Sequence, residues 1–480
     1  MTREQPRLNE HEPAQTLATP SGAVRICYID TSLRTDLGHY ANSCRNIAGE
    51  FRRRQLSVDV YGNRSMPASM AKRLGATPFF RHAGFENILA HLPISVLFRA
   101  DYLLGRTSFL QDLKSIWHRG PYDFLYLNSI LPAQLAALAT WLRTFPNGEA
   151  PAVVAEFGSP SGTGMADQVT QGGLNWRRHT PFYIEAAGLF RGDVQRPLLF
   201  TFDPIASADF ASLLQMPVET MPTVHAGTEP PRLRCRRDGR ITVSFLGHQR
   251  ADKGYHLVPE IVRGLLAQSL PIRILVHNGD PENDPISQEL EAMAKDLPEL
   301  VFEHAPADAK YWQDLLERSD LIALPYEPPR YRASYSAVAV EAVSAGIPLV
   351  VPAGTTMEAL MQSYQAGATS FSDWDACEIV KAIEMAVNDF EKLAQMSAAG
   401  ASRRNNENGA QNFVDRLLQL RPIESKTRIQ YRIKIGERVF NLVLDAFFSI
   451  TMNAMRAARA ILLFYRRSTR KFRTAASRAD

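Results

Sequence analysis

A carboxylate stands inside an otherwise small and apolar segment, "YRASYSAVAVEAVSAGIPLVV", which runs from Tyr331 to Val351. The stretch from Ser334 to Ala345 has the composition of a helix buried on most sides, yet Glu341 lies in its middle. Burying a charge among Ala and Val is costly unless a partner matches it, which favours a ligand-binding role. The alternative is a Glu that faces solvent or is satisfied by a neighbouring backbone group.

A bound nucleotide would supply partners for the polar groups of this helix. Ser334 is the expected N-cap after a Pro-rich loop, and Glu341 follows seven residues later. Seven residues place both side chains within about 20° on one helix face and ~10 Å apart along it. The helix start offers free N–H groups and a partial positive charge to a phosphate. Two turns further on, the carboxylate would meet the hydroxyls of a ribose attached to that phosphate.

Two cations follow another expected strand. The loop "HQRADKG" comes after "ITVSFLG" and contains Arg250 and Lys253. Alone, they would be ordinary surface charges. Ligands of open parallel sheets bind beyond the carboxyl ends of the strands, so this position favours a functional role. Together the two side chains could neutralise a diphosphate leaving group without a metal.

Two series of alternating strands and helices must position these groups. The first series has expected strands over 23–30, 57–63, 123–128, 151–158, 197–203 and 218–224, and the second over 240–247, 271–278, 300–305, 320–326 and 347–353. The stretch 65–120 is longer and less regular, and is expected to be an insertion of helices. Such alternation predicts an α/β protein with two doubly wound domains facing across a cleft.

The segment from Val243 to Pro352 resembles the GT-B glycosyltransferases, specifically the retaining group called family 4. "FLGHQRADKG" is similar to the family's donor-phosphate segment, and "SDLIALPYEPPRYRASYSAVAVEAVSAGIPLVVPAGT" to its strand, loop, donor helix and strand. The resemblance extends over Ala23 to Leu420. It implies two Rossmann-like domains, a nucleotide-diphosphate sugar in the C-terminal one, an acceptor in the N-terminal one, and transfer with retention at the anomeric carbon.

The resemblance also implies roles for individual residues. The donor- or nucleotide-binding residues it implies are Gly38, Gly247, Arg250, Lys253, Ser334, Tyr335, Ser336 and Glu341. The catalytic candidates are Arg250 and Lys253 at the diphosphate, His39 after the glycine loop, and Glu156, which would position the acceptor hydroxyl. For His39, a structural role and a catalytic role are equally expected. The family usually has a further glutamate, for the transferred sugar, where this chain has Ala333.

In the implied mechanism, Arg250 and Lys253 stabilise the departing diphosphate while the acceptor hydroxyl attacks from the same face. The leaving phosphate takes the proton, and no protein nucleophile is needed. The expected activity is therefore that of a retaining, hexosyltransferase-type enzyme in polysaccharide or glycolipid assembly. The alternatives are a nucleotide-sugar epimerase or hydrolase of the same fold, and a non-catalytic GT-B scaffold at the membrane.

Composition limits the cofactors and partners. The chain has 480 residues, 45% of them hydrophobic and 22% charged, as in a soluble protein of more than one domain. The cysteines, Cys27, Cys44, Cys235 and Cys377, are far apart and form no CxxC pair, which argues for a reducing compartment and against a zinc site. No metal, other cofactor or nucleic acid is expected, and a homo-oligomer stays open.

The C-terminal tail differs from the rest of the chain. From Pro422 onward it has thirteen Lys/Arg against four Asp/Glu, a net charge of +9, whereas the whole chain carries +4. Between Val439 and Phe464, polar residues recur every three or four positions among Val, Leu, Phe, Ile and Met, which predicts an amphipathic helix. The charged residues within it argue against a spanning helix.

Basic residues follow this helix, so the tail is expected to bind an anionic membrane surface. A helix packed on the enzyme or on a second subunit is the alternative. The expected location is cytoplasmic, on the inner face of the cell membrane, with a lipid-linked or glycan acceptor. The expected boundaries are a flexible leader over 1–21, an acceptor domain over 22–228, a donor domain over 229–405, a closing helix over 406–421 and the tail over 422–480.

Overall fold

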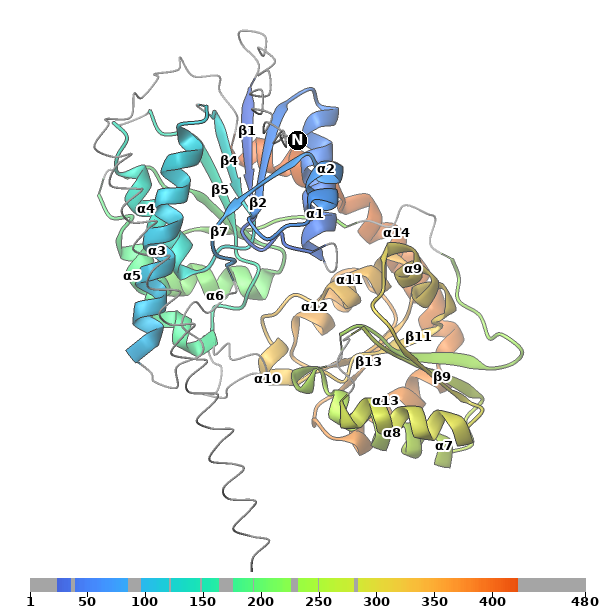
Figure 1. Ribbon diagram of the computed structural model, residues 1–480. Coiled ribbons are helices and arrows are strands. Elements are labelled where there is room, and N and C mark those ends of the chain that lie inside the picture. Colours follow the sequence, from blue (N-terminus) through green and yellow to red (C-terminus); the bar gives the residue numbers. More distant parts are fainter. Residues whose placement is uncertain are drawn as a thin grey trace, which may run out of the picture.

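The computed structural model contains two parallel sheets, each covered by helices on both faces (Figure 1). It describes residues 24–35, 39–84, 96–120, 122–146, 149–163, 176–192, 194–225, 232–248, 250–279 and 284–421. The expected leader, Gly38 and the basic tail lie outside the described residues. Within the described part of the chain, no helix is long and apolar enough to cross a membrane.

The N-terminal sheet has the strand order β3-β2-β1-β4-β5-β6-β7. Its strands are β1 (Arg25–Ile29), β2 (Ser57–Asn63), β3 (Ala76–Phe80), β4 (Phe124–Leu127), β5 (Ala152–Glu156), β6 (Leu198–Thr201) and β7 (Val218–Thr220). All neighbouring strands are parallel. Every residue of the central strand β4 is buried, because helices cover both faces of a parallel sheet.

Helices cover the two faces of this sheet as two separate cores. They are α1 (His39–Arg53), α2 (Ala68–Leu74), α3 (Val96–Trp117), α4 (Pro132–Leu142), α5 (Thr180–Gly188), α6 (Pro204–Leu214) and α15 (Ala410–Leu420). Leu113, Leu135 and Tyr183, from α3, α4 and α5, belong to one core. Ile47 of α1 and Phe413 of α15 belong to the other. The last described helix therefore returns to the N-terminal domain.

The stretch 65–120 contains a strand as well as helices, so the prediction of a purely helical insertion is wrong. Strand β3, "ATPFF", pairs with β2 at the edge of the sheet. Pro78 inside it is a poor signal for a strand because proline cannot donate a ladder hydrogen bond. An edge position tolerates that loss.

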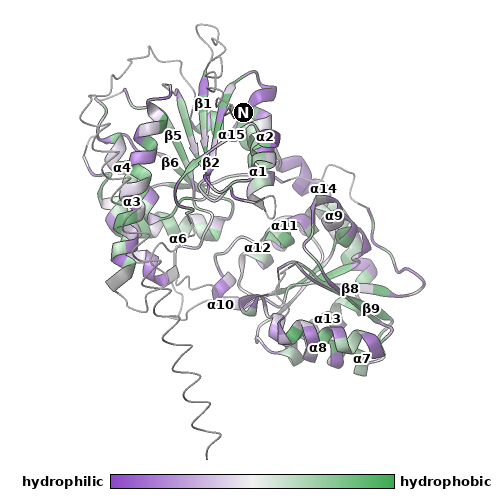
Figure 2. Cartoon of the chain, in the orientation of Figure 1, coloured by the Kyte–Doolittle hydropathy of each residue, from purple (hydrophilic) through white to green (hydrophobic). Residues whose placement is uncertain are grey.

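The C-terminal sheet has the order β10-β9-β8-β11-β12-β13, again all parallel. Its strands are β8 (Ile241–Phe245), β9 (Ile272–Asn278), β10 (Leu300–His304), β11 (Leu321–Ala323), β12 (Leu349–Pro352) and β13 (Ala368–Phe371). Its helices are α7 (Val258–Ala267), α8 (Pro285–Asp296), α9 (Ala309–Arg318), α10 (Pro328–Tyr331), α11 (Ala337–Ser344), α12 (Thr356–Ser363), α13 (Ala376–Asn388) and α14 (Phe390–Glu407), with short 3-10 turns η2 (Ala251–Lys253) and η3 (Tyr255–Leu257). Hydrophobic residues gather on the strands, and helices such as α7 and α8 are partly hydrophilic (Figure 2).

Contacts on two sides join the domains. Near α14, the buried Arg404 side chain donates hydrogen bonds to Ser344 of the C-terminal domain and to Thr223 of the N-terminal domain. Near the carboxyl ends of the strands, Arg332 after α10 forms an ion pair with Asp209 on α6. Figure 1 shows α10 as the part of the C-terminal domain that faces α6. The strand ends of the two sheets are thereby held near one another.

Candidate active site

Helix α11 begins two residues later than expected. Its N-cap is Ser336, whose hydroxyl accepts a hydrogen bond from the backbone N–H of the third helical residue at 3.3 Å. The prediction that Ser334 is the N-cap, on one helix face with Glu341, is therefore wrong. Ser334 lies in the turn before the helix because its hydroxyl accepts a 2.6 Å hydrogen bond from Arg330 and its carbonyl accepts one from Thr356.

Glu341 lies on α11 as expected, and a tryptophan contacts it. The Nε1–H of Trp312 on α9 donates a hydrogen bond to Glu341 Oε2. Burial raises the pKa of the Glu341 carboxyl, while this hydrogen bond and the charge of Arg404 lower it. Within the described residues, no cation forms an ion pair with Glu341. The side chain is thus half-buried and only partly matched by the protein.

Three of the expected donor-site elements converge at the start of α11. Gly247 follows β8 with a φ of +106°, in the left-handed region that favours glycine. A Cβ atom there would lie 3.5 Å from Val338 Cγ2 on α11 and 3.8 Å from Lys253 Nζ. Gly254 has a φ of +71°, and a Cβ there would lie 1.9 Å from the Pro325 carbonyl oxygen. These glycines let the loop that carries Lys253 pass close to α11.

The Lys253 ammonium group has no anionic partner among the described residues. Its Nζ lies 5.2 Å from the centroid of the Tyr326 ring. Burial lowers the pKa of Lys253 to about 7, helped by the positive charges of Arg250 and Arg330 and opposed by Asp252. A phosphate at this position would supply the missing negative charge.

Arg250 is less available than the sequence suggested. Its Nε and one terminal nitrogen donate to the two oxygens of Asp252, both at 3.0 Å, and the same terminal nitrogen donates to the Tyr331 hydroxyl at 3.2 Å. Arg330 approaches the same carboxylate, with its Nε 3.8 Å from Asp252 Oδ2. Three cations, Arg250, Lys253 and Arg330, therefore lie around the Asp252 carboxylate. Asp252 and Arg330 were not predicted as site residues, although "RADK" and "PPRYR" contain them.

In the N-terminal domain, Glu156 ends β5 and is 6% exposed. The Tyr126 hydroxyl donates to it at 3.3 Å, and burial, followed by the charge of Asp30, raises the pKa of Glu156 to about 8. Asp30 follows β1 and accepts a 2.9 Å hydrogen bond from Asn128; burial raises its pKa to about 7. Asp30 was not predicted as a site residue. His39 begins α1, and its side chain lies outside the described part.

Tyr335, in the turn before α11, contacts the N-terminal domain. Its ring centroid lies 5.7 Å from that of Phe202 of the N-terminal domain. Burial raises the pKa of the Tyr335 hydroxyl, and the charges of Glu341 and Glu156 raise it further, while Arg404 lowers it. The turn before α11 therefore reaches both halves of the expected active site.

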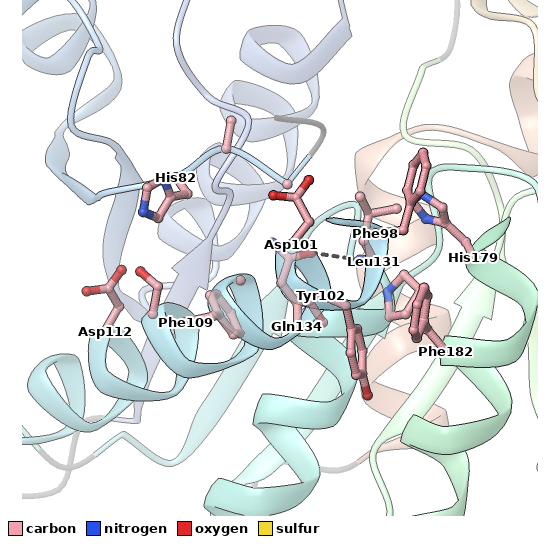
Figure 3. Close-up of a pocket in the computed structure, with 16 residues that line it drawn as sticks. His82, Phe98, Asp101, Tyr102, Phe109, Asp112, Leu131, Gln134, His179 and Phe182 are labelled. Atoms are coloured by element: carbon pink, nitrogen blue, oxygen red, sulfur yellow. Dashed lines mark hydrogen bonds between the residues drawn. The ribbon is translucent and has the colours of Figure 1, made fainter. Parts of the chain in front are cut away.

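A cavity of about 90 Å³ opens in the N-terminal domain (Figure 3). Its walls come from the segment 82–84 after β3, from α3, and from the starts of α4 and α5. The aromatic rings are those of Phe98, Tyr102, Phe109 and Phe182, and the polar groups are those of Asp101, Asp112, His82, His179 and Gln134. Gln134 Nε2 donates to Thr31 Oγ1 at 2.8 Å, next to Asp30. No local sequence pattern indicates this cavity, because its residues come from four separate segments, 82–84, 98–112, 131–134 and 179–182.

The architecture is that of known proteins. A sucrose-phosphate synthase from Thermosynechococcus elongatus matches with a TM-score of 0.58 at 13% identity, over 83% of this chain and 98% of that one. Anabaena HepE in complex with UDP-glucose matches with a TM-score of 0.54 at 14% identity, over 82% and 99%. A protein described as a UDP-N-acetylglucosamine 2-epimerase, from Listeria monocytogenes, matches with a TM-score of 0.50 at 12% identity, over 82% and 95%.

These similarities show that the chain has the GT-B fold, as the sequence predicted. No protein-family model matches the chain, and the search of curated proteins found no match. Among the described residues, no three His, Cys, Asp or Glu side chains gather as a metal site would require. The absence of a metal from the reaction stays a prediction.

Proposed function

We propose that the protein is a glycosyltransferase that moves a sugar from a nucleotide-diphosphate sugar to an acceptor hydroxyl. The observation that carries this proposal is the convergence of Gly247, Lys253 and the start of α11, with Glu341 further along the same helix. Because HepE binds UDP-glucose in a similar fold, a UDP-sugar is the proposed donor.

The diphosphate would lie against the free N–H groups of α11, where the helix end carries a partial positive charge. Lys253 and Arg250 would stabilise the charge that grows on the leaving diphosphate, which lowers the barrier more than equal binding of the substrate would. Glu341 would accept hydrogen bonds from the ribose. The acceptor hydroxyl would attack from the face that the nucleotide leaves, with retention, and the leaving phosphate would take its proton.

The cavity between α3, α4 and α5 is the proposed acceptor site. Its aromatic rings offer apolar faces to a sugar ring, and polar side chains, among them Asp101 and Gln134, belong to the same lining. An acceptor of this chemistry is the sugar end of a lipid-linked or surface glycan. Glu156, at the end of β5, is proposed to position the acceptor hydroxyl; its carboxyl accepts a hydrogen bond from Tyr126.

An assay of UDP release tests the proposed function directly. Purified protein is incubated with UDP-glucose and with other UDP-sugars, with and without an acceptor. We expect release of UDP that is slow alone and increases when a glycan acceptor is added. Loss of donor with no transfer to any acceptor, and appearance of an isomeric nucleotide sugar, would instead favour an epimerase. That alternative has one observation in its support, since the fold is shared with the Listeria protein described as an epimerase.

The tail prediction is tested with vesicles. Because the segment after Pro422 carries +9 and an amphipathic pattern, the full chain should sediment with anionic vesicles at low salt and be released at high salt. A version ending at Leu420 keeps every described helix up to α15 and should stay in the supernatant. Equal behaviour of the two versions would contradict membrane binding, and a dimer formed by the full chain alone would favour the oligomer alternative.

A further inference from the structure

The side chain that holds Glu341 comes from a different part of the chain. Trp312 lies on α9, and its Nε1–H donates to Glu341 Oε2 on α11. The Trp312 ring also lies edge-on to the ring of His277 near the end of β9, with centroids 6.4 Å apart at 63°. His277 is itself held, because its Nε2 lies 2.8 Å from the Ala305 carbonyl oxygen. The indole is thus packed between β9 and α11 and has a defined direction.

Trp312 is the single described side chain that forms a hydrogen bond with Glu341. Arg404 on α14 adds a positive charge that acts on Glu341, but its terminal nitrogens donate to Ser344, Thr223 and the His225 carbonyl. Tyr335, before α11, is the other titratable group that interacts with Glu341. Removing the indole N–H would therefore leave the half-buried Glu341 carboxylate with no hydrogen-bond donor among the described side chains.

The two carboxylate oxygens are left unequal by this contact. Oε2 accepts the indole hydrogen bond, whereas Oε1 accepts none from the described residues. With Oε2 hydrogen-bonded to the indole, Oε1 can accept a hydrogen bond from a ligand hydroxyl. A hydrogen bond to a charged group contributes about 1.5–3 kcal/mol, or roughly ten- to a hundredfold in affinity.

We infer that Trp312 is a positioning residue that orients Glu341, so that the site selects a nucleotide with free ribose hydroxyls. This inference rests on the proposed function, since it assigns the selectivity of the same donor site. Trp312 acts through Glu341 and need not touch the nucleotide. The contact between Trp312 and Glu341 was not predicted, because α9 precedes β11 in the chain and α11 follows it.

Calorimetric titration of the full chain with UDP and with 2′,3′-dideoxy-UDP tests the inference. Wild type should bind UDP about tenfold or more tightly than the dideoxy nucleotide. Trp312→Phe keeps the ring but lacks the N–H, so UDP affinity should fall about tenfold while dideoxy-UDP affinity changes little. The matched control is Trp374→Phe, which loses an Nε1 hydrogen bond to the Pro325 carbonyl at 2.8 Å and should keep the wild-type preference.

The pH profile separates positioning from a general structural effect. Wild-type affinity for UDP should fall on acidification as Glu341 takes up a proton, and affinity for dideoxy-UDP should not follow it. Because the indole bond lowers the Glu341 pKa, the midpoint should move to higher pH in Trp312→Phe. In a Glu341→Gln background, the tryptophan substitution should add little further loss.

An unchanged preference for UDP and an unchanged midpoint in Trp312→Phe would overturn the inference while the proposed function stands. If that variant fails to fold, the titration of the wild-type protein still tests the inference. Equal affinity for UDP and dideoxy-UDP would overturn the inference too. Failure of wild type to bind UDP, ADP or GDP would overturn the proposed function and the inference together.

Discussion

Replacement of Lys253 by Ala is expected to lower kcat/KM about a hundred- to a thousandfold, the loss seen when one preorganised group at a developing negative charge is removed. The expectation follows from the position of Nζ beside Gly247 and the start of α11, with no anionic partner among the described residues. The measurement is UDP release from a UDP-sugar at saturating acceptor. Lys295→Ala is the matched control, since Lys295 has a side chain 72% exposed on α8.

The role of Lys253 can also be tested by measuring the protons taken up when a nucleotide binds. Lys253 without a ligand has a pKa of about 7, so above that pH it is largely neutral, and binding of a diphosphate would raise its pKa. Nucleotide binding should therefore take up protons above about pH 7 and not well below it, measured by calorimetry in buffers of different ionisation enthalpy. Lys253→Arg keeps the charge and should remove the uptake, because arginine stays protonated. Unchanged turnover in Lys253→Ala would remove the central claim of the proposed function.

Replacement of Glu156 by Gln is expected to stabilise the protein at alkaline pH. The carboxyl has a folded pKa of about 8, against about 4.3 in an unfolded chain. Between these values the folded state binds the extra proton, so its stabilising effect is complete below the unfolded pKa and is lost as pH rises through the folded pKa. Wild type should lose up to about 1.4 kcal/mol per pH unit in that window through this group.

Thermal melting across the same window measures the effect. Glu156→Gln should melt above wild type near pH 8 and close to it near pH 5, where wild-type Glu156 is protonated. Glu291→Gln is the control, since its side chain is 59% exposed and should leave the profile of wild type unchanged. Parallel melting curves for Glu156→Gln and wild type would show that the carboxyl does not titrate in the folded state with a raised pKa. A loss of turnover in the same variant would separately support its place at the acceptor.

Much of the fold was predictable because it depends on local patterns. Apolar runs alternating with amphipathic segments predict parallel strands and helices wherever they occur, and the GT-B fold follows from that order. Two short strands, β3 and β13, were missed. The first contains a proline at a sheet edge, and the second, "ATSF", has a single fully buried residue, so neither carries the pattern of a central strand.

The sequence by itself determined which segments would meet. Residues that follow parallel strands lie at one edge of the sheet, which is why the order of strands along the chain is enough to place Gly247, Lys253 and the α11 segment together. The tertiary structure alone decided which side chains contact one another. Ser336 rather than Ser334 caps α11 because Arg330 and Thr356 hold Ser334 in the preceding turn. The partners of Glu341 and Glu156 likewise come from distant elements, and a side-chain contact between distant elements depends on how the layers pack, which a one-dimensional pattern does not encode.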